Sequence, residues 1–173
     1  MGKTWCIADT HFGHEKIIAY ESRPCSSVAE MDSMLIRNWN ATVGDDDKVF
    51  FLGDFAFASA GRIQEILRVL RGYKVMVLGN HDRDRSVSWW LEAGFAEVSA
   101  YPIVVDEFFI LSHEPMYIST NMPYANIFGH VHSNPMYATV TPQSFCVCAE
   151  RINFTPIDFE EVKERIRQAG GQG

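Results

Sequence analysis

Short apolar runs punctuate the chain at intervals, and they are rich in β-branched and aromatic residues. Runs of this kind are typical of buried strands. They lie at Thr4–Ala8, Lys48–Leu52, Lys74–Leu78, Phe108–Leu111, Asn126–Phe128, Tyr137–Val140 and Ser144–Ala149. A further short strand is expected at Ile103–Val105.

Amphipathic segments separate the early runs and predict helices. Ser27 and Glu30 have the spacing of a capping box, and Val28, Leu35 and Trp39 follow at helical spacing. Three more helices are expected: one with Ile63, Ile66, Leu67 and Leu70 that ends near Gly72, one that begins near Ser86, and one with Phe159, Val162 and Ile166. Strand and helix alternate in the first half and strands dominate the second, so the pattern predicts an α/β fold.

Composition narrows the class of protein further. The 173 residues, 47% of them hydrophobic, predict one globular domain over residues 1–173. No apolar run approaches the ~18–20 residues of a membrane span, and we see no signal peptide, so a cytoplasmic protein is expected. The net charge of −7 disfavours a general nucleic-acid binder.

The four cysteines do not form a CxxC motif. They are Cys6, Cys25, Cys146 and Cys148. We expect reduced thiols rather than disulfides or a thiolate metal site, with Cys146 and Cys148 on one face of a strand.

Candidate metal ligands follow the apolar runs, where each predicted strand ends. The groups are Asp9 and His11; Asp54; Asn80, His81 and Asp82; His113; and His130 and His132. In open α/β sheets, sites form at the carboxyl ends of strands, so these side chains are expected to converge. Five of the six histidines lie in these groups, which favours a shared site over isolated structural histidines.

The donor types indicate which ions such a site would take. Imidazole, carboxylate and amide oxygen, without thiolate, suit manganese, iron, cobalt or zinc. Seven groups are too many for one ion but enough for two ions that share a carboxylate: Asp9, His11, Asp54, Asn80, His113, His130 and His132.

The order of these motifs along the chain resembles that of a known protein superfamily. D-x-H, G-D, G-N-H-D, a lone His and G-H-x-H run from Asp9 to His132 and resemble the calcineurin-like metallophosphoesterase superfamily, in particular its compact, cap-less bacterial and phage members. The resemblance implies two mixed β-sheets packed as a sandwich and flanked by helices. It also implies a dinuclear centre, with manganese first and iron, zinc, nickel or cobalt as alternatives.

Ligand roles follow from the resemblance. One ion would take Asp9, His11 and His132. The other would take Asn80, His113 and His130, and Asp54 would bridge the two.

The resemblance also implies a catalytic role for His81. A metal-bridging hydroxide would attack phosphorus, and His81 would protonate the leaving group. Asp82 is a candidate to orient His81, or else a turn residue.

Three residues are candidates for substrate contact. Asn80 lies in the G-N-H-D motif, and His14 follows the D-x-H motif within one turn. Arg23 could clamp a phosphate bidentately. The alternatives are a rim residue for His14 and a solvated loop charge for Arg23.

The function expected from these motifs is a metal-dependent phosphoesterase, and first of all a phosphodiesterase. A phosphomonoesterase of the same mechanism and a non-catalytic scaffold of this fold are the alternatives, and a nuclease is disfavoured by the acidic charge. The expected partner is a small phosphate ester such as a nucleotide, without a membrane, in a monomer or a homodimer.

Overall fold

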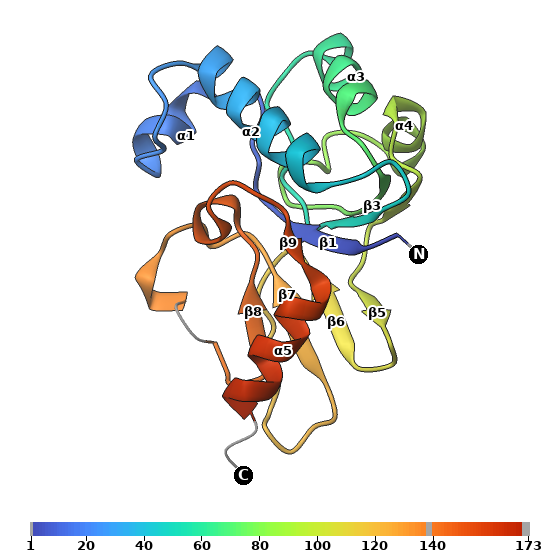
Figure 1. Cartoon of the computed structure of the whole chain (residues 1–173), viewed down its shortest axis with the longest axis vertical. Helices are drawn as coiled ribbons and strands as arrows, with labels where there is room; N and C mark the ends of the chain where they lie inside the picture. The colour runs from blue at the N-terminus through green and yellow to red at the C-terminus, as the bar shows by residue number, and fades with distance from the viewer. Residues whose placement is uncertain (1, 138–139, 171–173) are drawn as a thin grey trace.

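Two β-sheets face each other in the computed structural model, which describes residues 2–137 and 140–170 (Figure 1). The first sheet has the strand order β4-β3-β2-β1-β9. Its strands are β1 (Thr4–Ile7), β2 (Lys48–Phe51), β3 (Tyr73–Val77), β4 (Glu97–Ser99) and β9 (Ile157–Asp158). Strands β1 to β4 run parallel and β9 runs antiparallel to β1.

The second sheet has the order β5-β6-β7-β8. Its strands are β5 (Ile103–Val105), β6 (Phe109–Ser112), β7 (Ala125–Phe128) and β8 (Ser144–Cys146). Strands β6, β7 and β8 are parallel and β5 is antiparallel to β6. The two sheets join just beyond β1 and β8, where the amide of Ala8 donates to the carbonyl of Val147 at 2.9 Å.

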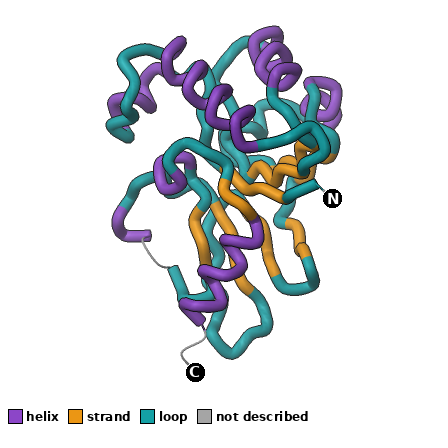
Figure 2. Tube along the Cα trace, in the orientation of Figure 1, coloured by secondary structure: helices purple, strands orange, loops and turns teal. Residues whose placement is uncertain are grey.

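Helices enclose both sheets (Figures 1 and 2). Four of them pack on one face of the first sheet: α1 (Glu15–Tyr20), α2 (Val28–Thr42), α3 (Ala60–Val69) and α4 (Val87–Ala93). Helix α5 (Phe159–Gly170) contacts β1, β8 and β9. Two 3₁₀ helices, η1 (Pro135–Tyr137) and η2 (Ala149–Ile152), lie in the second half.

Successive side chains of the central strands point to opposite faces of the first sheet, so each strand contributes to two hydrophobic cores. Ile7 and Phe51 face the helices, whereas Cys6, Phe50 and Val75 face the second sheet. Both faces of the first sheet are therefore buried, which explains why its strands read as continuous apolar runs.

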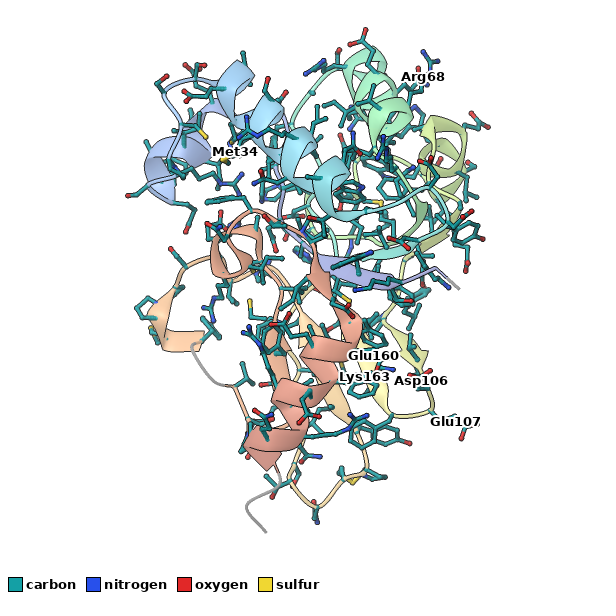
Figure 3. All side chains as sticks on the ribbon, viewed as in Figure 1. Met34, Arg68, Asp106, Glu107, Glu160 and Lys163 are labelled. Carbon is teal, nitrogen blue, oxygen red and sulfur yellow. The ribbon has the colours of Figure 1, made fainter. Side chains whose placement is uncertain are left out.

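Side-chain caps start the helices where the sequence predicts. The Ser27 hydroxyl accepts the Glu30 amide at 3.2 Å, and the Glu30 carboxylate accepts the Ser26 amide at 2.7 Å. Ser59 and Ser86 cap α3 and α4 in the same way. On α5, the Lys163 ammonium donates to the carboxylates of both Asp106 and Glu160 at 2.7 Å, so the charge of this lysine is paired within the protein (Figure 3).

The mixed α/β sandwich confirms the predicted fold class, with three omissions and one correction. The sequence analysis missed α1, β4 and β9, which are all short. The strand predicted at Tyr137–Val140 is wrong at its ends, because Tyr137 ends η1 and Val140 lies in a bend, while residues 138 and 139 lie outside the described residues.

Two further expectations concern the thiols and membranes. All four cysteines are free thiols, and the sulfur atoms of Cys146 and Cys148 lie 3.3 Å apart. Within residues 2–137 and 140–170, no helix has the length and apolar character needed to cross a bilayer.

Candidate metal centre

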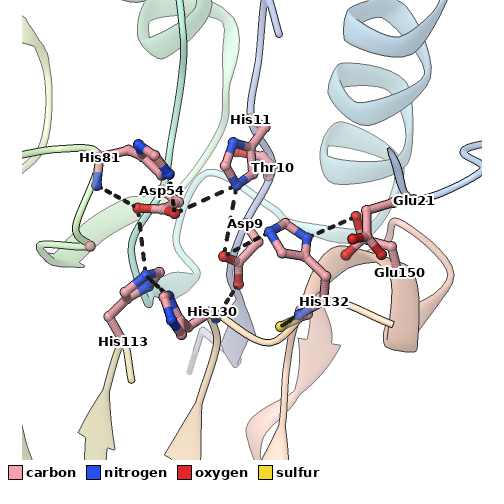
Figure 4. Close-up of polar contacts among 12 residues, drawn as sticks. Asp9, Thr10, His11, Glu21, Asp54, His81, His113, His130, His132 and Glu150 are labelled. Carbon is pink, nitrogen blue, oxygen red and sulfur yellow. Dashed lines mark hydrogen bonds and ion pairs between the residues drawn. The ribbon is translucent and has the colours of Figure 1, made fainter. Parts of the chain in front are cut away.

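The predicted ligand residues meet at the seam between the two sheets (Figure 4). Strands β1, β2 and β3 of the first sheet and β6 and β7 of the second are each followed by at least one of them. Five separate stretches of chain therefore supply one site, as parallel strands that share an edge allow.

The first cluster consists of Asp9, His11 and His132. The Nε2 atoms of His11 and His132 lie 3.9 and 3.8 Å from Asp9 Oδ1. Asp9 and His11 are buried, and His132 is half-buried. These distances leave room for a cation between the atoms rather than a direct hydrogen bond.

The second cluster consists of Asp54, Asn80, His113 and His130. The Asn80 side-chain oxygen lies 2.9 Å from His113 Nε2 and 3.0 Å from His130 Nδ1. His113 Nδ1 lies 2.8 Å from the Leu52 carbonyl, which can only accept, so His113 donates there and turns an unprotonated Nε2 into the cluster.

Asp54 links the two clusters. Its Oδ2 atom lies 3.6 Å from His11 Nε2, and its Oδ1 atom lies 3.5 Å from His113 Nε2. One oxygen thus faces each cluster, which is the geometry of a carboxylate that can bridge two ions.

The unpartnered atoms at the seam suit positive ions. Asp9 Oδ1 and both ring nitrogens of His11 are buried and have no hydrogen-bond partner among the described residues. Buried polar atoms left without a partner are costly unless a cation binds them. In the second cluster, the Asn80 side-chain oxygen lies 2.9 Å from His113 Nε2 and 3.0 Å from His130 Nδ1. The residues present therefore fit a pair of divalent ions.

Burial shifts the pKa values of several of these groups. It raises the pKa of Asp9 well above its usual range and lowers the pKa values of His11 and His113. Each shift favours the neutral form. A bound cation would reverse this preference for Asp9 and would use the neutral imidazoles directly.

The backbone is strained at these positions. Asp9, His11, Asp54, His130 and His132 all have φ between 48° and 72°, in the left-handed region. Non-glycine residues there cost of order 1–3 kcal/mol each and cluster at functional sites. The strain turns the side chains off the strand axes and into the seam.

Glycines make room for the close approach of these loops. A Cβ on Gly129 would lie 2.5 Å from Asp9 Oδ2, and one on Gly53 would lie 2.5 Å from His113 Nδ1. Gly53 also has φ +87°. The glycines of the G-D and G-H-x-H motifs are therefore required by space.

A buried carboxylate, which the sequence analysis missed, orients His132. Glu150 Oε1 lies 3.2 Å from His132 Nδ1 and also accepts from the Arg23 guanidinium at 2.6 Å. Burial opposes protonation of His132, but Glu150 and Asp9 outweigh it and raise its pKa to about 8. No motif marks Glu150, because it lies eighteen positions from His132 on a 3₁₀ helix.

The structure corrects the role expected for Arg23. Its side chain is 0% exposed, so it cannot reach a substrate. Its guanidinium instead donates to the carbonyls of Asp9 and Thr10 at 2.8 and 2.7 Å. Arg23 therefore holds the loop that carries the D-x-H motif in its strained shape.

The structure also corrects the role expected for Asp82. Its carboxylate accepts the amides of Asp54, Phe55 and Gly79 at 2.6, 3.0 and 2.8 Å, and no bond to the His81 ring is recorded among the described residues. Asp82 ties the loop after β2 to the loop after β3. It positions Asp54 rather than His81.

His81 and His14 lie at the mouth of the site. The side chain of His81 is 46% exposed, and its Nε2 lies 3.9 Å from Asp54 Oδ2, above the clusters (Figure 4). His14 is half-buried on the rim, with its ring 5.4 Å from that of His11, and burial lowers its pKa.

Fold and site together define a class: an α/β sandwich whose seam holds two clusters of carboxylate, imidazole and amide donors joined by one aspartate. A scan against known protein families finds no match. A relative covers nearly the whole chain: the uncharacterized protein MJ1445 of Methanocaldococcus jannaschii is 35% identical over an alignment of 175 residues that covers 97% of this chain and 93% of that protein. The chain belongs to the family of that protein.

Two other similarities are narrower. The gene 66 protein of Mycobacterium phage L5 is 35% identical over an alignment of 85 residues that covers 47% of this chain and 41% of the phage protein. A crystal structure of AQ665, a protein of unknown function from Aquifex aeolicus, has a TM-score of 0.72 at 24% identity and covers 95% of this chain and 99% of that chain. The likeness to AQ665 supports the fold.

Proposed function

We propose that this protein is a metal-dependent phosphoesterase of the calcineurin-like metallophosphoesterase type, acting first of all on phosphodiesters. The observation that carries the proposal is the pair of donor clusters that share Asp54. Two divalent ions bound there would polarise a phosphoryl group and lower the pKa of an attacking water. Manganese is the first candidate, because the donors are imidazoles, carboxylates and an amide.

The protein's own side chains would supply negative charge, orient a ligand histidine and transfer a proton. Asp9 and Asp54 supply negative charge, and His132 is fixed by Glu150 so that its Nε2 faces Asp9. His81 is exposed above the clusters, where it can pass a proton to the oxygen of a departing alcohol. Catalysis then combines charge stabilisation at the seam with proton transfer at its mouth.

A direct assay tests this proposal. Metal-stripped protein is given Mn²⁺ and assayed with bis-p-nitrophenyl phosphate beside p-nitrophenyl phosphate. We expect metal-dependent turnover of the diester, and none in Asp54→Asn prepared in the same way, which excludes a contaminating phosphatase. Dominant turnover of the monoester would instead favour a phosphomonoesterase. Bound Mn²⁺ without turnover of either ester would overturn the enzyme in favour of a binding scaffold.

A further inference from the structure

A cavity of about 650 Å³ opens beside the metal centre, and the ligand assignments leave it unused. The loops after β2 and β3 form its walls, together with the start of α3. Asn80 and His81 line it, so the cavity and the centre share a boundary. A group bound in this cavity would lie next to the His81 ring.

Phe57 provides an aromatic wall for this cavity. It is 39% exposed, although it lies among the histidines of a polar site. Its ring stacks on that of His14 with centroids 4.1 Å apart and lies 4.7 Å from the ring of His81. The Phe57 amide donates to the Phe12 carbonyl at 2.8 Å, which fixes its backbone. An exposed ring held in this way is preorganised to stack on a ligand.

The charges at the far end of the cavity cancel. Arg85 pairs with Asp84 at 3.1 Å, donates to the Ala58 carbonyl at 3.3 Å, and lies 4.6 Å from the centroid of the Trp89 ring. The guanidinium is thus already paired within the protein. The cavity therefore suits an uncharged flat group better than a second phosphate.

We propose that this cavity holds the leaving group of the ester and that Phe57 selects a leaving alcohol with a flat aromatic ring, either an aryl alcohol or a nucleoside. This inference rests on the proposed function. His81, the proposed acid, lies within 3.9 Å of Asp54 on one side and lines the cavity on the other. The oxygen that receives its proton therefore lies on the cavity side.

The reaction balances with water alone. Phosphorus gains a bond to the water oxygen and loses its bond to the alcohol oxygen. His81 gives its proton to that alcohol oxygen, and the proton released by the water restores His81 through solvent. No oxidant, reductant or second substrate is required.

Binding of small phosphate esters to Mn²⁺-loaded protein tests the cavity apart from turnover. Phenyl phosphate and methyl phosphate offer the same phosphate to the metal centre and differ only in the ring. Because the ring can stack on Phe57, we expect phenyl phosphate to bind about tenfold tighter, measured by calorimetry and by inhibition of diester turnover. Thymidine 5′-phosphate serves as the nucleoside arm.

Three variants test whether the ring of Phe57 causes the preference for phenyl phosphate. Phe57→Leu keeps an apolar side chain and should lose the preference for phenyl over methyl phosphate, whereas Phe57→Trp should keep it. Tyr73→Ala is the control, because Tyr73 is an exposed aromatic residue at the opposite end of β3. It should keep the wild-type preference.

The outcomes separate the two proposals. Wild-type protein that hydrolyses the diester but binds both phosphates equally, or a Phe57→Leu variant that keeps the preference, overturns the cavity assignment and leaves the phosphoesterase standing. Wild-type protein that neither binds nor hydrolyses phosphate esters overturns the phosphoesterase itself. A preference for phenyl phosphate without one for thymidine 5′-phosphate assigns the cavity to aryl alcohols.

Discussion

His132 is held by a buried chain of charges rather than by its own strand. Glu150 accepts from Arg23 and faces His132 Nδ1, while Arg23 holds the carbonyl of Asp9. Carboxylates that fix a ligand histidine raise metal affinity by setting its tautomer and direction. Arg23 and Glu150 would therefore influence an ion bound at the candidate centre by orienting His132 and the loop that carries Asp9.

Replacing Glu150 tests this chain. Glu150→Gln keeps the size of the side chain but removes its charge, and we expect Mn²⁺ to bind about 10–100-fold more weakly in equilibrium dialysis. Glu21→Gln is the matched control, because the Glu21 carboxylate also lies near His132 but accepts hydrogen bonds from Ser133. Equal losses in both variants would show that net charge, not the orientation of His132, sets the affinity.

His81 is expected to act on protons rather than on metal. His81→Ala should bind Mn²⁺ as the wild type does, because its ring belongs to neither donor cluster. Turnover of an ester with a poor leaving group should fall by roughly 10²–10⁴, and that of p-nitrophenyl esters by less. Rates across a series of leaving groups measure this, and a uniform loss or a loss of metal would contradict the role.

At the residue scale, sequence motifs were sufficient for the donors but not for their supports. Asp9, His113 and His132 lie within a few positions of the end of a strand, so local spacing predicts them. Arg23 and Glu150 are 127 positions apart, and only tertiary packing brings them together. Because the sequence does not reveal this contact, it predicted that Arg23 binds a substrate phosphate.

At the scale of elements, Asp47 connects β1 to the turn before β2. Its carboxylate accepts the Lys3 amide at 2.7 Å, the Trp5 indole at 2.8 Å and the Gly44 amide at 2.9 Å. The bond from Gly44, followed by those from Trp5 and Lys3, lowers the pKa of Asp47 below its usual range. The carboxylate therefore stabilises the fold when ionised.

The sign of the pH dependence follows from that lowered pKa. The stabilisation is fully present above the unfolded value of about 3.9 and is lost as pH falls through the lower folded value. Asp47→Asn should reduce the free energy of unfolding by about 1 kcal/mol at pH 7, with a smaller difference in strong acid. Urea unfolding measures this, with the exposed Asp45→Asn as control. A difference that grows toward acid would contradict it.

Element prediction succeeded where local signals were strong. Serine at the helix start together with apolar positions located α2 and α4, and apolar periodicity alone located α3. Helix α1 lacks a side-chain cap hydrogen bond, and β9 has two residues paired only with β1. Both elements form through contacts with the assembled sheets, and a local sequence pattern cannot predict such contacts.

At the scale of the whole molecule, the candidate metal centre lies where the two sheets meet. Asp9, His11 and Asp54 come from the first sheet, whereas His113 and His130 follow strands of the second. Ions bound between them would add a crosslink to the apolar packing and the backbone hydrogen bonds of Ala8 that already join the two sheets. Ligand binding to the native state alone stabilises that state by mass action.

Metal should therefore raise the melting temperature of stripped protein. At a free Mn²⁺ concentration 100-fold above Kd, the stabilisation is about 2.7 kcal/mol, or roughly 5–10 °C for a chain of this size. Asp54→Asn should lose most of this shift, because Asp54 faces both clusters. The readout is the shift rather than the melting temperature itself, since removing a buried carboxylate can stabilise the stripped protein.

His14→Ala is the control for the shift in melting temperature, because His14 lies on the rim and belongs to neither cluster. It should keep the wild-type shift. His113→Ala removes a donor that the second sheet supplies, and it should lose most of the shift if the ions span the seam. A full shift in His113→Ala together with none in Asp9→Asn would place the bound metal in the cluster of Asp9, His11 and His132 alone.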